Sequence, residues 1–126
     1  MRMLVVDDSL VVRNAVSRNA ESVAVTEVLR AEDGEQAVRL FDHHRPELVT
    51  MDLTMPHLDG IGAIVAIRAI EPATSILVIS ALNSHRVALD AIHKGACGFL
   101  AKPFNDTELI DALCELVTHA RTHGRA

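Results

Sequence analysis

Residues 49–60 read VTMDLTMPHLDG, and this stretch shows how the chain is built. Strand-forming apolar residues lead to a single carboxylate, Asp52, and a short segment containing Pro56 then precedes Asp59-Gly60. A short apolar run is typical of a buried strand, and the Asp-Gly pair indicates the start of a helix. Taken alone, the stretch leaves three roles open for Asp52: turn residue, metal ligand or reactive group.

The same alternation of strand and helix continues on both sides of this stretch. Apolar, β-branched runs and helical periodicities follow one another five times along the chain. Five successive βα units predict an α/β fold, an open parallel sheet with helices on both faces, in a single domain over residues 1–126. The expected strands are 3–6, a weaker edge strand within 24–31, 48–51, 75–79 and 98–101; the expected helices are 9–20, 33–44, 60–70, 84–94 and 105–118.

Helix ends can be predicted from capping residues. Asp33 and Gln36 form a possible capping box for the second helix, and residues 105–108 (NDTE) do the same for the last. Gly95 is expected to end the fourth helix. Residues 119–126 are mildly basic and are expected to be a frayed helix end.

Composition excludes several classes of protein. Aromatic residues make up 2% of the 126 residues, the net charge is −5, and the basic residues are scattered. Nucleic-acid binding by base stacking or by a basic stripe is therefore not expected. No apolar run approaches 18 residues and no signal peptide is visible, so we expect a cytoplasmic protein with no membrane segment.

The cysteines and histidines do not form a recognisable metal motif. Cys97 and Cys114 are 17 positions apart without CxxC spacing, so we expect reduced, half-buried cysteines, with a disulfide or zinc site as the alternative. The seven histidines are expected to be solvated surface residues for the most part. The seven histidines are His43, His44, His57, His85, His93, His119 and His123.

A chemically active side chain follows four of the five strands. These residues are Asp7 and Asp8, Asp52, Ser80, and Lys102 before Pro103. Each alone is explained by a helix cap, a turn or a solvated surface residue. Together they should meet in one crevice beyond the carboxyl ends of the strands, where parallel sheets carry their sites.

The charge of that crevice predicts its ligand. Three carboxylates and one ammonium leave a net charge of −2, which favours a divalent cation. An oxygen-only ligand set suits Mg²⁺, which keeps several of its waters. With the cation bound, Ser80 and Lys102 can receive phosphoryl oxygens, and a carboxylate there is a competent nucleophile toward phosphorus.

With these motifs the chain resembles the receiver domain of two-component response regulators, in particular the stand-alone, CheY-like type. The resemblance covers nearly the whole chain. It implies a flavodoxin-like (βα)5 three-layer sandwich with strand order 2-1-3-4-5. The motifs are LVVDDS at 4–9, EDGEQA at 32–37, VTMDLTMPHLDG at 49–60, VISA at 78–81 and KGACGFLAKPF at 94–104.

The resemblance also implies roles for the polar residues. Asp52 would be phosphorylated from a phosphohistidine on a partner histidine kinase. Asp7 and Asp8 would hold Mg²⁺ with Asp52, assisted by the backbone carbonyl of Thr54.

Further roles follow for the residues after the fourth and fifth strands. Lys102 would pair with the acyl phosphate, its bond to Pro103 being cis, and Ser80 would hydrogen-bond the phosphoryl group. Phe99 stands where the family has a rotating aromatic; an ordinary core phenylalanine is the alternative. Thr54 and Asn83 are candidates for tuning dephosphorylation.

Several functions are consistent with this resemblance. The first is a phosphoacceptor, not a conventional enzyme, that catalyses its own phosphorylation and dephosphorylation. It would signal in chemotaxis through the surface of the fourth helix, fifth strand and fifth helix, to a flagellar motor switch protein, as a monomer or weak phosphorylation-dependent dimer. Alternatives are a phosphorelay intermediate serving a histidine phosphotransferase, or a receiver fragment of a larger regulator or hybrid kinase. A haloacid-dehalogenase-type phosphatase is disfavoured, since it needs DxD after the first strand.

Overall fold

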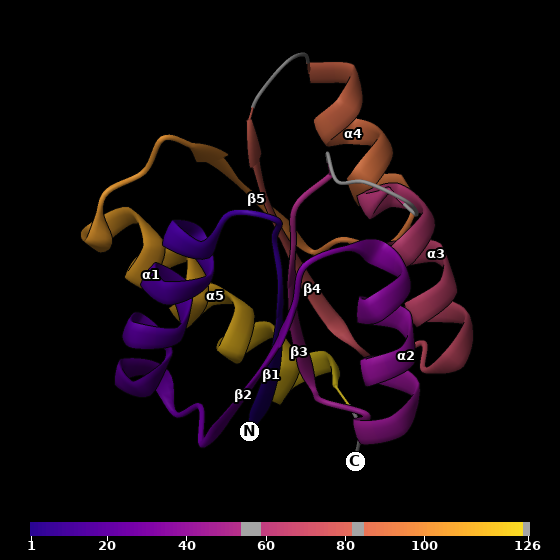
Figure 1. The fold of residues 1–126 in the computed structure, drawn as a ribbon, viewed down its shortest axis with the longest axis horizontal. Coiled ribbons are helices and arrows are strands. Elements are labelled where there is room, and N and C mark those ends of the chain that lie inside the picture. Colours follow the sequence, from indigo (N-terminus) through magenta and orange to yellow (C-terminus); the bar gives the residue numbers. More distant parts are fainter. Residues whose placement is uncertain (54–58, 82–84, 125–126) are drawn as a thin grey trace.

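The chain forms a five-stranded parallel sheet in the order β2-β1-β3-β4-β5 (Figure 1). The computed structural model describes residues 1–53, 59–81 and 85–124. The expected flavodoxin-like fold and strand order are confirmed. The strands are β1 (Arg2–Val6), β2 (Glu27–Ala31), β3 (Leu48–Met51), β4 (Ser75–Ala81) and β5 (Gly98–Lys102).

Helices cover both faces of the sheet, in three layers. Figure 1 shows two helices on one face, α1 and α5, and three on the other, α2, α3 and α4. The 3-10 helix η1 follows α1. The bounds are α1 (Leu10–Ala20), η1 (Glu21–Val23), α2 (Gly34–His44), α3 (Gly60–Ile70), α4 (His85–His93) and α5 (Asp106–His123).

Alternation along the central strands builds two separate cores. In β1, Leu4 and Val6 face the cluster that contains α2 and α3, whereas Met3 and Val5 face the cluster that contains α1 and α5. Because successive side chains point to opposite faces, a strand covered on both sides is apolar along most of its length. This is why β1 and β3 appear in the sequence as nearly continuous apolar runs, with Arg2 at the start of β1 and the buried Thr50 within β3 as the exceptions.

Most predicted boundaries agree with the structure to within one residue, and two differ by more. The fourth strand continues through Ser80 and Ala81, because these residues pair with Ala101 and Lys102 of β5. The last helix is regular through His123, not frayed from residue 119. Burial of Ala120 against the core holds this final turn in place.

The predicted caps are present, with one difference in detail. Asn105 and Glu108 form a complete capping box at the start of α5. The Asp33 side chain accepts from the Gln36 N–H, but the Gln36 side chain accepts from Glu32 N, one residue earlier than a capping box requires. Gly95 follows α4 with φ +127°, a conformation that favours glycine.

The two cysteines are exposed and free, so the expectation of half-buried cysteines is wrong. Cys97 precedes the edge strand β5, and Cys114 lies on α5 beside Ser22 and Val23. Among the histidines, His44 and His119 are half-buried, and His119 Nδ1 lies 2.9 Å from Ser75 Oγ.

Over the described ranges, no helix is both long and apolar enough to cross a membrane.

Candidate functional site

The parallel register brings the polar residues after β1 and β3 together. Val6 pairs with Met51, so Asp7 and Asp52 leave the sheet side by side. The main chain continues the ladder at both positions: Asp52 N donates to Val6 O at 3.0 Å, and Asp7 N donates to Ala31 O at 3.1 Å. The sheet therefore holds the backbone of both acids rigidly at its carboxyl edge.

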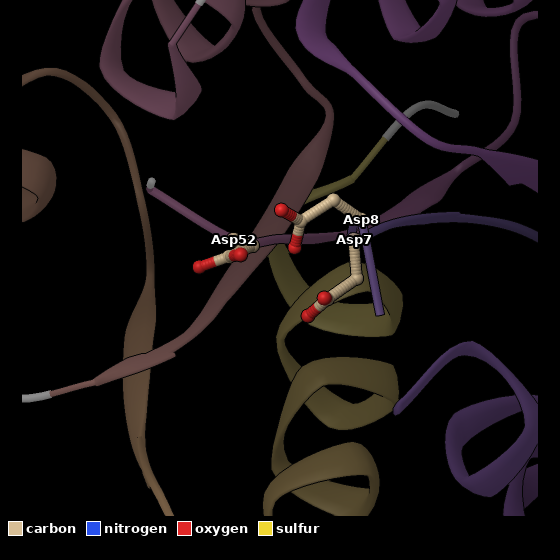
Figure 2. A group of neighbouring side chains, drawn as sticks. All are labelled: Asp7, Asp8 and Asp52. Atoms are coloured by element: carbon tan, nitrogen blue, oxygen red, sulfur yellow. The ribbon is translucent and has the colours of Figure 1, made fainter. Parts of the chain in front are cut away.

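Three carboxylates meet at this edge (Figure 2). Oxygens of Asp7, Asp8 and Asp52 lie within 4.8 Å of one another. Asp7 is 1% exposed and Asp52 5%, whereas Asp8 is exposed. Within the described part of the chain this is the only such group of three or more histidine, cysteine or acidic side chains. A compact, oxygen-only donor set with one ligand open to solvent fits a hard divalent cation that keeps some of its waters.

The Asp7 carboxylate accepts hydrogen bonds from its own chain segment and from β5. Its Oδ1 accepts from Ser9 N at 2.9 Å, and its Oδ2 accepts from Lys102 Nζ at 2.8 Å. Burial raises the pKa of Asp7, and the Asp52 charge adds to this, while the bonds from Lys102 and Ser9 oppose it. Desolvation outweighs these partners, so an additional positive charge at this carboxylate would be stabilising.

The Asp52 side chain accepts a hydrogen bond from the neighbouring strand, β4. Ser80 Oγ donates to Asp52 Oδ1 at 2.6 Å and accepts from Leu53 N at 3.3 Å. Ser80 is 2% exposed and lies within β4, not beyond its end as its place after the apolar run suggested. Lys102 Nζ lies 3.6 Å from Asp52 Oδ2, and the Lys102-Pro103 bond is cis.

The structure thus brings together five of the residues singled out from the sequence: Asp7, Asp8, Asp52, Ser80 and Lys102. Phe99 is half-buried in β5 and packs against the core cluster beneath α2, α3 and α4. Thr54 and Asn83, for which the resemblance implied a metal contact and a tuning role, lie outside the described residues.

Two further residues support the site in ways that the sequence did not indicate. Arg13 is 8% exposed, and its Nη1 donates to the Asp7 carbonyl at 2.7 Å. The sequence feature that could have indicated this role is the position of Arg13 on the apolar face of the first helix, three residues before Val16. The second is Gly60: a Cβ there would lie 2.2 Å from the Asp52 carbonyl oxygen and 2.5 Å from Leu53 Cα. The sequence indicated Gly60 only as a helix start.

Comparison with known proteins places this arrangement in a family. The response regulator receiver domain matches residues 3–114. The chemotaxis protein CheY of Listeria monocytogenes is 34% identical over 90% of this chain and 95% of its own length. CheY of Bacillus subtilis is 38% identical over 89% of the chain and 93% of its length. A probable transcriptional regulatory protein, NarL of Mycobacterium tuberculosis, is 34% identical over 91% of the chain but 54% of its length.

Solved structures agree with the sequence comparison. A Vibrio cholerae chemotaxis protein CheY superposes with a TM-score of 0.82 at 30% identity, covering 91% of this chain and 97% of that one. A CheY from Borrelia burgdorferi, crystallised as a CheX–CheY–BeF3–Mg²⁺ complex, gives a TM-score of 0.86 at 29% identity, covering 92% and 88%. The chain therefore belongs to the response regulator receiver domain family of two-component signalling systems.

Proposed function

We propose that Asp52 accepts a phosphoryl group from a phosphohistidine of a partner histidine kinase, and that this modification switches the α4, β5 and α5 surface toward a protein target. Receiver domains are phosphoacceptors that histidine kinases phosphorylate, and they bind Mg²⁺. The observation that carries the proposal here is the position of Asp52, which lies beside two further acids and within reach of both Ser80 and Lys102.

Asp7, Asp8 and Asp52 are the residues that would hold Mg²⁺, with the Thr54 carbonyl as the further ligand that the family resemblance implies. The metal would supply positive charge for the phosphoryl oxygens during transfer. Because the donor set consists of carboxylates only, with Asp8 open to solvent, water can complete the coordination.

In the transfer itself, an Asp52 carboxylate oxygen forms a bond to phosphorus while the phosphorus–nitrogen bond of the donor breaks. The electron pair of that bond returns to the imidazole. Lys102 Nζ lies within 3.6 Å of Asp52 and can move from Asp7 toward the new phosphoryl oxygens. Hydrolysis of the acyl phosphate would take place in the same site, so the chain would catalyse its own phosphorylation and dephosphorylation without a separate substrate.

Ser80 connects this chemistry to the proposed output surface. Its hydroxyl now donates to Asp52 Oδ1; after phosphorylation it would donate to a phosphoryl oxygen instead. Ser80 pairs with Ala101 across β4 and β5, and Phe99 lies two residues before Ala101 on the same strand. Contacts that differ between the two states are what shifts the equilibrium. A nearly complete switch needs about 5.5 kcal/mol, which several charge-assisted hydrogen bonds can supply.

We further propose that the target belongs to chemotaxis, with the flagellar motor switch as the first candidate. The two CheY relatives match over more than nine-tenths of their own lengths, whereas the NarL relative matches over about half. A single receiver domain over residues 1–126, monomeric or weakly dimeric when phosphorylated, is consistent with this. A phosphorelay intermediate is the second candidate, and phosphoryl flow from the labelled protein to a histidine phosphotransferase would favour it over binding to a motor-switch peptide.

Acetyl phosphate with Mg²⁺ tests the phosphoacceptor directly. We expect intact mass spectrometry to show one added phosphoryl group and peptide mapping to place it on Asp52. Asp52→Asn should abolish labelling, and Asp90→Asn, which removes an exposed acid on α4, should leave it unchanged. Labelling of Asp52→Asn to the same extent as the original chain would disprove the assignment.

A further inference from the structure

A cavity opens at the edge of the sheet between β5 and α5. It has a volume of about 170 Å³ and is lined by the apolar residues Leu77, Ala112 and Leu116, together with Cys97, Glu115 and His119. Because β5 is the last strand of the sheet, no further strand covers this side. The cavity is large enough for one aliphatic side chain, and it lies on the α5 side of β5, opposite the face on which the Phe99 side chain packs.

The exposed side of α5 beside this cavity is acidic. Glu108, Asp111 and Glu115 are three and four residues apart, so they follow one face of the helix, and all three are exposed. Asp111 and Glu115 have no ion-pair partner among the described residues. We call Glu108, Asp111, Glu115 and the cavity together the acidic groove.

Positive charge near the acidic groove lies at its other end. The charge of Arg68 acts on His119, and the Arg68 guanidinium donates to the Thr74 carbonyl at 3.0 Å. The charge therefore changes along the groove. It is positive near His119 and negative at Glu115 and Asp111, toward the start of α5. A ligand with positive charge at that end is the one that complements it.

We propose that the acidic groove binds a cationic segment of a partner protein, which inserts an apolar side chain beside Leu77 and Leu116 and places lysine or arginine against Glu115 and Asp111. A second copy of this chain is disfavoured, since a symmetric contact would oppose two identical acidic faces. Any change in binding on phosphorylation, through the pairing of Ser80 with β5, rests on the proposed function; the chemistry of the partner does not.

Two synthetic amphipathic peptides provide the probe. They share the same leucines, and one carries lysine and the other glutamate at every polar position. We expect fluorescence anisotropy to show binding of the lysine peptide alone, weakening as salt is raised. The measurement uses the full chain without a phosphodonor, so its outcome is independent of whether Asp52 can be phosphorylated. Equal binding of both peptides would overturn the proposal.

The two cysteines locate the bound peptide. Cys97 borders the acidic groove, whereas Cys114 is exposed on another side of α5, beside Ser22 and Val23. We expect the lysine peptide to slow alkylation of Cys97 and to leave Cys114 unaffected, as followed by mass spectrometry. Equal protection of both thiols would show that the peptide binds the acidic surface without selecting the groove, and would overturn the proposal.

Substitutions distinguish an effect of charge in the acidic groove from an effect of the net charge of the protein. Glu115→Lys should weaken binding of the lysine peptide about 3- to 10-fold, because it reverses a charge at the contact. Glu27→Lys makes the same change in net charge on the exposed side of β2, at the opposite edge of the sheet, and should have little effect. Ala112→Leu should weaken binding by filling the cavity without altering charge. If Glu27→Lys weakens binding as much as Glu115→Lys, the proposal fails; circular dichroism confirms that each variant is folded.

Discussion

Lys102 donates a 2.8 Å hydrogen bond to Asp7, a residue 95 positions away in the sequence. The same ammonium is 3.6 Å from the nearest oxygen of Asp52. In the structure described, the lysine therefore neutralises an acid proposed to bind metal more closely than it approaches the proposed phosphoacceptor. Metal binding and the position of Lys102 should consequently be coupled.

This coupling predicts that Lys102→Ala binds Mg²⁺ more tightly. The variant removes a cation that competes for the Asp7 carboxylate, so the dissociation constant should fall about 3- to 10-fold, corresponding to roughly 1 kcal/mol. Isothermal titration calorimetry measures it, with Lys94→Ala as the control because Lys94 is exposed. The variant should retain some labelling of Asp52 but lose its effect on target binding. Weaker Mg²⁺ binding would show that Lys102 does not compete with the metal.

Magnesium should stabilise the fold through Asp8. At ten times its dissociation constant, a ligand that binds only the folded state adds about 1.4 kcal/mol to the free energy of unfolding. Because Asp8 is exposed, Asp8→Asn should remove this gain without disturbing the interior. Urea unfolding with and without Mg²⁺ measures the effect, and Asp42→Asn, on the surface of α2, should keep the full gain. Stabilisation of Asp8→Asn equal to that of the original chain would argue against this ligand set.

Gly60→Ala should be strongly destabilising. The added methyl would overlap the Asp52 carbonyl oxygen and Leu53 Cα, so the backbone beneath the site must move, at a cost of about 2–3 kcal/mol. Labelling of Asp52 by acetyl phosphate should also slow. Gly62→Ala, two residues further into α3, should be neutral or stabilising because alanine favours a helix. Similar unfolding midpoints for both variants in urea would contradict this expectation.

His119 should make stability depend on pH. Burial lowers the pKa of His119 below 6.5, and the charges of His123 and Arg68 lower it further. The folded state then binds fewer protons at His119 than the unfolded state. The contribution of His119 to the free energy of unfolding is therefore fully present above pH 6.5 and is lost as pH falls through the folded pKa. His119→Asn can still hydrogen-bond Ser75 and should flatten this decline. Parallel curves for both proteins between about pH 7.5 and 5.5 would contradict it.

Local patterns were enough to predict the elements of the fold. The bounds of β3 and α3 were predicted to the residue because the apolar run ends at Asp52 and Asp59-Gly60 begins a helix. The caps at Asp33 and Asn105 were predicted because a side-chain oxygen needs only the N–H groups of its own helix. These features depend on neighbours within four residues, and a sequence shows such neighbours directly.

The sequence by itself determined the alternation of strands and helices, and with it the edge at which Asp7, Asp8, Asp52, Ser80 and Lys102 gather. Only the tertiary structure decided that Ser80 lies within β4 and donates to Asp52, that Asp7 is buried while Asp8 is exposed, and that Lys102 pairs with Asp7. It also decided that both cysteines are exposed. The reason is physical: local structure follows from residues close in the chain, whereas these contacts depend on how strands and helices distant in sequence pack to within a few ångströms.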